Sequence, residues 1–253
     1  MIQLKNSAQI SAMMEAGRIT GEALLVAREH VREGVSTIEL DTLIRNHIEK
    51  CGAKPSFLGY SGFPASACIS INDEVIHGIP SKKRILQEGD IVKIDVGAFY
   101  KGFHGDSART IAVGNVSEEA SRLITVTRES FFCGVAAVKT GNRIGDVGSA
   151  IQGCVENAGF SVVKRYIGHG VGHELHESPD VPNFGTAGRG TRLCAGMTLA
   201  IEPMVNVGSA DVYELPDGWT VKTRDGSLSA HYENTIALTS EGVIITTLVD
   251  REW

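Results

Sequence analysis

The sequence has no long apolar run and no pattern of paired cysteines. No apolar stretch approaches the roughly 18 residues of a membrane span, and residues 1–9 are polar, unlike a signal peptide. The five cysteines form no C-x-x-C pair, which argues against a disulfide framework and a thiolate zinc site. The 24 basic residues do not exceed the 30 acidic ones, so nonspecific nucleic-acid binding is not expected. We therefore expect a cytoplasmic protein that binds neither DNA nor membranes.

The overall composition is that of a folded protein. Of 253 residues 42% are hydrophobic, and the net charge is -6, which together exclude a disordered protein. Apolar residues three and four apart predict a first helix between Ser7, as its N-cap, and Gly34. We also expect helices at 38–51, 117–138 and 145–158, strands at 67–71, 91–98 and 107–113, and a β-rich segment after residue 159.

A weak internal repeat relates the helical regions. At an offset of 107 residues, glycine, acidic and aliphatic positions recur in the same order. The matched positions are Gly34, Glu39, Ile44, Ile48, Glu49 and Gly52 with Gly141, Asp146, Ile151, Val155, Glu156 and Gly159. Any two amphipathic helices can be aligned in this way, so chance agreement is one interpretation. The other is a duplicated α/β half, which would place a functional site between the halves.

The most informative segment is IVKIDVGAFYKGFHGDSARTIAV, residues 91–113. A two-residue turn centred on Tyr100 and Lys101 would place Asp95 directly opposite Asp106. The apolar run around Asp95 predicts that it is buried, and like charges facing each other across strands are destabilising. Such a pair must share a proton or bind a cation. Taken alone, Asp106 has the alternative of being an ordinary loop residue.

Two more carboxylates adjoin apolar strands. Glu202 ends the run MTLAI, and Glu233 lies in HYENTIAL. Each has the alternative of a structural salt bridge to Arg or Lys. Four carboxylates in predicted strands without a matching set of cations nevertheless favour a metal site.

Histidines cluster in GHGVGHELHE, residues 168–177, which lacks the HExxH spacing of zincins. His169 lies between two glycines, so it can approach a metal closely, whereas His77 stands alone, as structural histidines commonly do. Carboxylates with one imidazole suit Mn, Fe, Co or Zn. Bridging carboxylates favour two ions about 3.5–4 Å apart that activate a water for hydrolysis. The candidate ligands are Asp95, Asp106, His169, Glu202 and Glu233.

The chain resembles the type I methionine aminopeptidases of bacterial type. The resemblance rests on five motifs in order: PSFLGYSGFPASACISINDEVIHGIP, KIDVGAFYKGFHGDSART, GHGVGHELHE, MTLAIEPM and DGWTVKTRDGSLSAHYENT. It implies the α/β pita-bread fold, in which two pseudo-symmetric halves surround a central curved antiparallel sheet. We accordingly expect one domain, residues 1–253, with halves of about 1–115 and 116–253. The implied activity is removal of the N-terminal methionine of nascent proteins when the second residue is small.

The resemblance also assigns roles to the five ligands of two divalent ions. Asp95 would chelate one ion, and Asp106 and Glu233 would bridge both. His169 and Glu202 would hold the second ion, and Glu202 would also move the proton of the attacking water.

Further residues are assigned by the same motifs. His77 would contact the scissile amide nitrogen, and His176 the carbonyl oxygen, where negative charge develops. The resemblance implies a methionine pocket lined by Tyr60, Phe63, Cys68, Leu175 and Trp219. It also implies a site for one monovalent cation, Na or K, at Asn72, Glu74 (through its carbonyl) and Ser229.

The sequence departs from the usual motifs of this family at two positions, and two rival functions share the implied fold. Leu175 replaces a frequent aromatic residue, and His231 replaces a common glutamine, which leaves the role of His231 open. One rival is an X-Pro-directed peptidase of the same fold, although those carry a large N-terminal domain. The other is a ribosome-associated pita-bread binding protein, with the basic triplet at 82–84 as a transient contact, for which a solvated loop is the simpler interpretation. Nothing in the sequence demands a dimer, so a monomer is expected.

Overall fold

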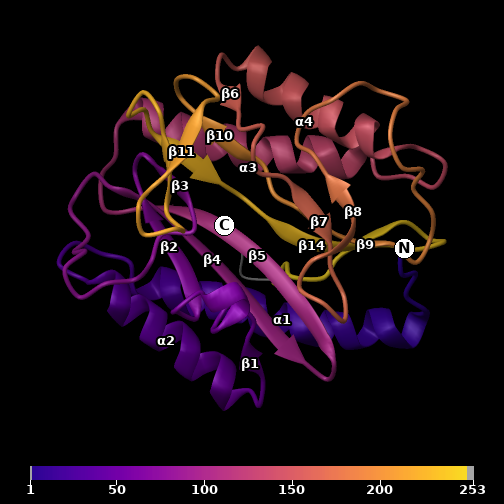
Figure 1. The fold of residues 1–253 in the computed structure, drawn as a ribbon, viewed down its shortest axis with the longest axis horizontal. Coiled ribbons are helices and arrows are strands. Elements are labelled where there is room, and N and C mark those ends of the chain that lie inside the picture. Colours follow the sequence, from indigo (N-terminus) through magenta and orange to yellow (C-terminus); the bar gives the residue numbers. More distant parts are fainter. Residues whose placement is uncertain (1, 250–253) are drawn as a thin grey trace.

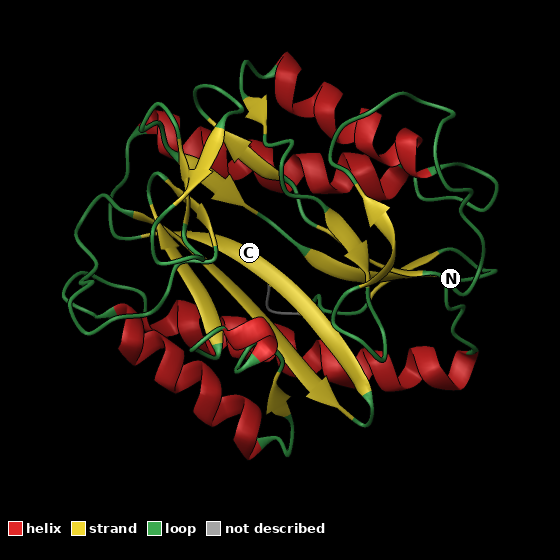
Figure 2. Cartoon of the chain, viewed as in Figure 1, coloured by secondary structure: helices red, strands yellow, loops and turns green. Residues whose placement is uncertain are grey.

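The computed structural model describes residues 2–249. Helices lie on two outer sides of the molecule, with strands between them (Figures 1 and 2). The α-helices are α1 (Ser7–His30), α2 (Thr37–Lys50), α3 (Glu118–Ala136) and α4 (Ile144–Asn157), which confirms the predicted helices to within a few residues. Within residues 2–249, no helix is both long enough and apolar enough to cross a membrane.

The N-cap of α1 is Asn6, not Ser7 as predicted. The Asn6 side-chain oxygen accepts a hydrogen bond from Gln9 N at 3.0 Å, and the Gln9 side chain accepts one from Asn6 N at 3.0 Å. This reciprocal pair satisfies two backbone donors that the helix start would otherwise leave unpaired. Ser7 is therefore the first helical residue.

In residues 2–249 the strands form four antiparallel sheets. The first half of the chain contains β1 (Lys54–Pro55), the short 3-10 helix η1 (Tyr60–Gly62), β2 (Ala67–Ile71), β3 (Glu74–Ile76), β4 (Ile91–Tyr100) and β5 (Phe103–Ala112). The expected β-rich segment contains β6 (Ser161–Val162), β7 (Gly168–Gly170), β8 (Glu177–Val181), β9 (Thr198–Ile201), β10 (Met204–Asn206), β11 (Val212–Glu214), β12 (Val221–Thr223), β13 (Ser229–His231), β14 (Asn234–Leu238) and β15 (Val243–Ile245). The sheet orders are β1-β4-β2 with β5 beside β4, β13-β10-β6, β11-β12-β3, and β15-β14-β9-β7-β8.

The turn between β4 and β5 lies one residue later than predicted. Tyr100 pairs with Phe103, so the turn residues are Lys101 and Gly102. Both have positive φ, 49° and 84°, the backbone geometry that two-residue hairpins prefer because it matches the twist of the strands.

The shifted turn changes which residues face Asp95. Asp95 pairs with Ala108, and Asp106 pairs with Gly97, so the predicted direct opposition of the two carboxylates is wrong. Asp95 and Asp106 are instead diagonal neighbours, since Asp106 lies two residues from Ala108, the partner of Asp95. Because side chains alternate between the two faces of a sheet, both carboxylates lie on the same face. Diagonal placement leaves room for an ion between them.

The helices are joined to the sheets by apolar cores. Aliphatic side chains of α1 and α2 pack against β2 and β4, and those of α3 and α4 pack against strands of the second half. Gly17 of α1 and Gly105 of β5 approach each other closely, since a Cβ on Gly105 would lie 2.8 Å from the Gly17 Cα. Thr20 then donates its hydroxyl to the Gly105 carbonyl at 3.1 Å. This contact places β5, and with it Asp106, against α1.

The helix bounds reproduce the offset found in the sequence. Adding 107 to 37 and 50, the ends of α2, gives 144 and 157, the ends of α4. The bounds agree with a duplicated α/β half, which stays a prediction.

Candidate metal centre

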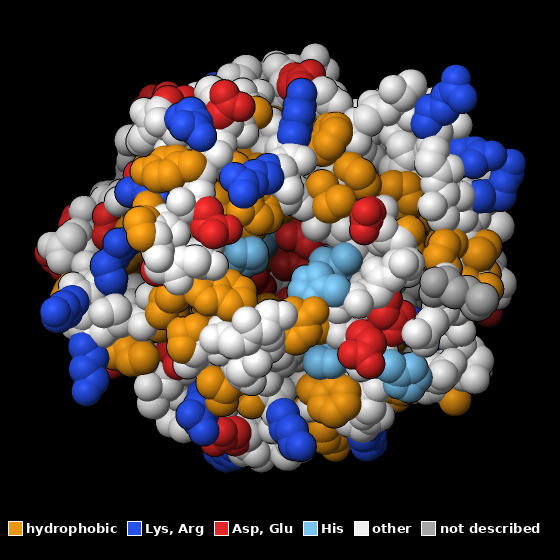
Figure 3. Space-filling view, viewed as in Figure 1, with side chains coloured by type: hydrophobic (Ala, Val, Ile, Leu, Met, Phe, Trp, Pro, Cys, Tyr) orange, Lys and Arg blue, Asp and Glu red, His pale blue; other side chains and the backbone are white. Residues whose placement is uncertain are grey.

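The five predicted ligands meet in one cavity of about 180 Å³. Asp95 and Asp106 come from β4 and β5, and His169 from β7. Glu202 directly follows β9, and Glu233 lies between β13 and β14. Figure 3 shows the hollow in this face of the molecule, with acidic and histidine side chains inside it. Both halves of the chain therefore supply side chains to the same site.

His169 is held in a tautomer that can bind a metal. Its Nδ1 lies 2.8 Å from the Gly170 carbonyl, which can only accept, so Nδ1 carries the proton. Its Nε2 lies 3.5 Å from Glu202 Oε1 and 3.8 Å from Asp106 Oδ2. Burial lowers the pKa of His169 to about 3, so the lone pair of Nε2 remains available at neutral pH.

The four carboxyl groups repel one another in a buried space. Burial raises the pKa of Asp106 to about 7, and burial with mutual repulsion raises the pKa of Asp95, Glu202 and Glu233 well above their ordinary values. Within residues 2–249, one buried oxygen each of Asp95, Asp106 and Glu233 has no hydrogen-bond partner. A divalent cation would satisfy these oxygens and compensate the charge, so the residues present fit a metal centre.

His231 belongs to this cluster, although its role was open in the sequence. Its side chain is 1% exposed, and its Nε2 lies 3.8 Å from oxygens of both Glu202 and Glu233. Neither ring nitrogen has a hydrogen-bond partner in the described part of the chain. Ligand atoms within 4.8 Å of one another form two groups, Asp95 with His231 and Glu233, and Asp106 with His169 and Glu233. Because Glu233 is common to both groups, it lies between two candidate ion positions.

Arg109 on β5 supports the ligands, and the sequence analysis missed it. The buried guanidinium donates to the Glu233 carbonyl at 2.6 Å and to Asn234 Oδ1 at 2.8 Å. It also lies 4.1 Å from the centre of the Tyr232 ring. These contacts fix the backbone that carries Glu233. The sequence did contain a signal for Arg109, because it is a cation inside the predicted strand that also carries Asp106.

All five residues of the predicted methionine pocket line the cavity. Phe63 and Trp219 meet edge to face with ring centres 5.0 Å apart, and Leu175 is 2% exposed. The predicted set Tyr60, Phe63, Cys68, Leu175 and Trp219 is extended by Phe57 and Ser61, which the sequence analysis did not single out. Both flank Tyr60 in the chain, and η1 turns this segment toward the cavity.

His77 lines the same cavity from a constrained backbone. Its φ of 59° lies in the left-handed region, which is uncommon for a residue other than glycine. Its ring lies 6.2 Å from that of Trp219. Burial, with a smaller contribution from His176, lowers the pKa of His77 to about 4, so the imidazole is neutral at neutral pH.

His176 is oriented by a neighbouring tyrosine. Its Nδ1 lies 2.8 Å from the Tyr60 hydroxyl, and its ring centre lies 4.0 Å from that of His169. Burial lowers the pKa of His176 below its ordinary value. His173 is exposed, as is His176, but it packs on Phe103 and lies outside the cavity lining, as expected for a surface residue.

The predicted monovalent-cation residues lie together but do not form an open site. The Asn72 carbonyl accepts a hydrogen bond from Ser229 N at 3.1 Å and a second from the Lys93 ammonium at 2.7 Å. The Glu74 carboxylate pairs with Arg84 at 2.8 Å. Because an amine already contacts the carbonyl that would bind the ion, the residues present do not fit an added cation.

Residues 11–240 match the model of metallopeptidase family M24. The chain belongs to this family. It is 54% identical to the methionine aminopeptidase of Clostridium acetobutylicum over 250 residues, which cover 99% of this chain and 100% of that protein. The methionine aminopeptidase structure from Thermotoga maritima has a TM-score of 0.97 at 45% identity and covers 98% of this chain and 100% of that one. These findings confirm the α/β pita-bread fold.

A structure of the rival type is less similar. The prolidase of Pyrococcus furiosus has a TM-score of 0.78 at 26% identity, and the match covers 98% of this chain but 66% of that one. The prolidase therefore shares this fold, and the difference in identity and coverage favours the methionine aminopeptidases.

Proposed function

We propose that the chain is a metal-dependent aminopeptidase that removes the N-terminal methionine of peptides whose second residue is small. The observation that carries this proposal is the cavity itself, in which carboxylates and His169 lie beside a narrow apolar pocket. The high identity to methionine aminopeptidases over nearly the whole chain supports the same substrate.

The centre is proposed to hold two divalent ions, Co, Mn, Fe or Zn. The two ligand groups that share Glu233 support this number. The mixed carboxylate and imidazole donors suit several of these metals. When bound, such ions polarise the scissile carbonyl and lower the pKa of water for attack. The protein contributes fixed donors, with His169 oriented by the Gly170 carbonyl.

Residues around the centre are proposed to position the peptide. The neutral imidazole of His77 contacts the scissile amide nitrogen, and that of His176 donates to the carbonyl oxygen as negative charge develops there. The Tyr60 hydroxyl holds the second imidazole in place. Glu202, whose buried carboxyl has a raised pKa, accepts the proton of the attacking water and passes it to the leaving amine.

The apolar wall accounts for the choice of methionine. Phe63, Leu175 and Trp219 surround a space that an unbranched thioether side chain can fill, whereas a charged side chain would lose its hydration without a partner. Leu175, where an aromatic residue is frequent, leaves this wall more flexible. Because the pocket residues and the candidate ligands line the same cavity, a single residue is proposed to precede the scissile bond.

Peptide cleavage by the metal-loaded chain tests the assignment. Met-Ala-Ser is expected to be cleaved, Ala-Ala-Ser poorly and X-Pro peptides poorly. Faster cleavage of X-Pro peptides would replace the proposal with the prolidase-like rival. Binding of ions without cleavage of any of these peptides would favour a non-catalytic role.

The proposed setting is a monomer in the cytoplasm that acts on nascent chains. Lys82 and Lys83 are exposed, and Arg84 is held by Glu74, so the triplet presents two outward ammonium groups to an anionic partner. A transient ribosome contact at this loop stays a prediction. Cosedimentation of wild-type chain and of a Lys82→Ala, Lys83→Ala variant with ribosomes at low and physiological salt measures it.

A further inference from the structure

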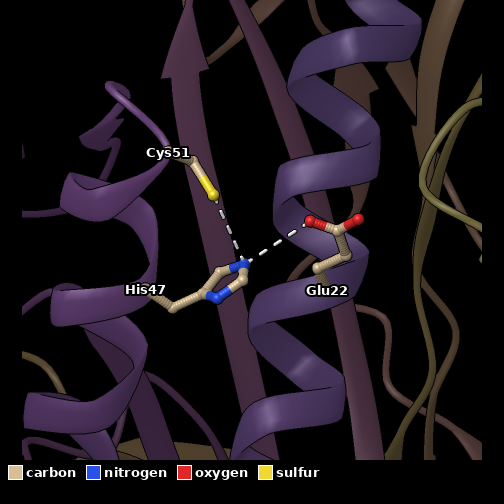
Figure 4. Close-up of side chains that lie close together, drawn as sticks. All are labelled: Glu22, His47 and Cys51. Carbon is tan, nitrogen blue, oxygen red and sulfur yellow. Dashed lines mark hydrogen bonds and ion pairs between the residues drawn. The ribbon is translucent and has the colours of Figure 1, made fainter.

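A second cluster of metal-binding side chains lies on the outer side of the molecule, between α1 and α2. Glu22 comes from α1, His47 from the last turn of α2, and Cys51 directly follows α2. Figure 4 shows the three side chains pointing toward one another. Their ligand atoms all lie within 4.8 Å of one another. None of the three lines the catalytic cavity.

One of the two contacts in this cluster is longer than a hydrogen bond. His47 Nε2 lies 3.6 Å from Glu22 Oε2 and 3.7 Å from Cys51 Sγ. The contact with sulfur is within the range of a hydrogen bond, whereas hydrogen bonds between nitrogen and oxygen are typically about 2.7–3.2 Å long. A hydrogen bond between His47 and Cys51 therefore does not explain why the Glu22 carboxylate approaches the same ring nitrogen.

The same distances match the edges of a tetrahedral metal site. Zinc lies about 2.3 Å from thiolate sulfur, about 2.0–2.1 Å from imidazole nitrogen and about 2.0–2.2 Å from carboxylate oxygen. Tetrahedral angles then separate sulfur from nitrogen by about 3.5–3.6 Å and nitrogen from oxygen by about 3.3–3.5 Å. The observed 3.7 and 3.6 Å need only small side-chain rotations to reach these values.

Local structure holds the three groups in place. His47 and Cys51 are four residues apart, which puts them on one side of the helix end. Arg18 binds the other carboxylate oxygen of Glu22 at 2.6 Å, so Oε2 is directed at His47. Carboxylates that bind metals are commonly oriented in this way. His47 is 22% and Glu22 33% exposed, so an ion can enter from solvent.

We propose that Glu22, His47 and Cys51 bind one zinc-like divalent ion, with water as the fourth ligand. The thiol of Cys51 loses its proton to solvent when the ion binds. A thiolate with an imidazole selects zinc over the hard ions magnesium and calcium. Because the ligands come from two helices, the ion would bind the folded chain only and fasten α1 to α2.

Cobalt spectroscopy of the full chain tests this site apart from the catalytic centre. The proposed catalytic ligands are oxygen and nitrogen atoms, so a near-ultraviolet sulfur-to-cobalt charge-transfer band reports a thiolate ligand elsewhere. We expect the band in wild type and in Cys133→Ser, an exposed-cysteine control, and its loss in Cys51→Ser. Cys68→Ser, which removes the thiol inside the catalytic cavity, is expected to keep it.

Zinc content gives a second measurement. Cys51→Ser and His47→Ala should each bind one zinc fewer per chain than wild type, while cleavage of Met-Ala-Ser changes by less than about twofold. Absence of the band in wild type, its persistence in Cys51→Ser, or its loss in Cys68→Ser alone would each overturn the proposal.

A second inference concerns Lys93, which is 1% exposed on β4. Its amine donates to the Asn72 carbonyl at 2.7 Å, where Ser229 N also binds. Burial lowers the pKa of Lys93 to about 7, and the nearby carboxylates of Asp73, Glu74 and Asp90 offset part of this effect. The Lys93 amine thus lies where the predicted monovalent cation would contact the Asn72 carbonyl. We infer that the Lys93 side chain replaces this ion, so the chain needs neither Na nor K.

Salt-exchange measurements test the second inference. The melting temperature of wild type should be the same in KCl and in choline chloride at equal ionic strength. In Lys93→Ala and Lys93→Ser, KCl should raise it above the choline value, whereas Lys222→Ala, which removes a lysine paired with Asp73 near the surface, should show no such response. A wild-type melting temperature that rises with KCl alone, or Lys93 variants indifferent to it, would overturn the inference.

Discussion

The hydroxyl of Tyr60 lies 2.8 Å from Nδ1 of His176, and the two rings are stacked 5.2 Å apart at 22°. The two residues are 116 positions apart in the sequence. Their contact joins the segment that forms one pocket wall to the loop that follows His169. It leaves Nε2 of His176 as the nitrogen available to a substrate. Tyr60 is thus a positioning residue as well as a pocket residue.

Removing this hydroxyl tests the positioning role. Tyr60→Phe keeps the ring and loses one hydrogen bond, whose net value is about 0.5–1.5 kcal/mol. We expect kcat for Met-Ala-Ser to fall roughly 2- to 10-fold with little change in KM. A change confined to KM would show that Tyr60 acts only through pocket shape.

Asp106→Asn should abolish activity and weaken metal binding. A bridging ligand must carry charge and offer two acceptor oxygens, and the amide offers one acceptor and no charge. Metal content by elemental analysis and cleavage of Met-Ala-Ser measure both effects. Asp180→Asn, on the exposed side of β8, serves as the control and should retain both. Full metal loading with retained activity in Asp106→Asn would remove it from the ligand set.

His77→Ala and His176→Ala should each keep normal metal content and lose catalysis. Losing one donor to a developing oxyanion typically lowers kcat about 10²–10³-fold, and losing an acid–base group about 10²–10⁴-fold. His173→Ala is the matched control and should change kcat by less than about tenfold, since its ring packs on Phe103 outside the cavity. Thermal melts separate these effects from loss of folding. Equal inactivity of all three variants would mean that the wrong histidines are assigned.

Stabilisation by metal should increase as the pH rises from about 4 to about 7, the interval over which the pKa of Asp106 is shifted. In metal-free protein the pKa of Asp106 is raised to about 7, and a group with a raised folded-state pKa loses its contribution to stability as the pH rises through that value. His169, whose pKa is lowered to about 3, is already neutral in the metal-free folded protein over this range, so binding of an ion does not change its protonation. Bound ions compensate the carboxylates, so the difference in melting temperature between loaded and metal-free protein should grow with pH. A constant difference would show that the carboxylates do not bind the ions.

The local pattern of the sequence determined the secondary elements and predicted the candidate metal ligands. Helical spacing located α2 and α4, and their bounds preserve the 107-residue offset. Asp95 was identified because a charge inside an apolar run must be compensated wherever the strand lies. Such inferences succeed because burial and charge act within a few residues. The sequence predicted the β4–β5 turn one residue too early, and a shift of one residue changes every pair in the hairpin.

Tertiary structure alone decided which distant side chains meet. The sequence could not place His231 beside Glu202, or show that the amine of Lys93 lies on the Asn72 carbonyl, because these contacts depend on how segments far apart in the sequence are brought together. Likewise, Glu22 and Cys51 share the Nε2 of His47 only because α1 and α2 pack side by side. Hydrogen bonds and metal coordination act over a few ångströms. The sequence therefore supplies the interacting groups, and the packing of the fold decides which of them come within a few ångströms of one another.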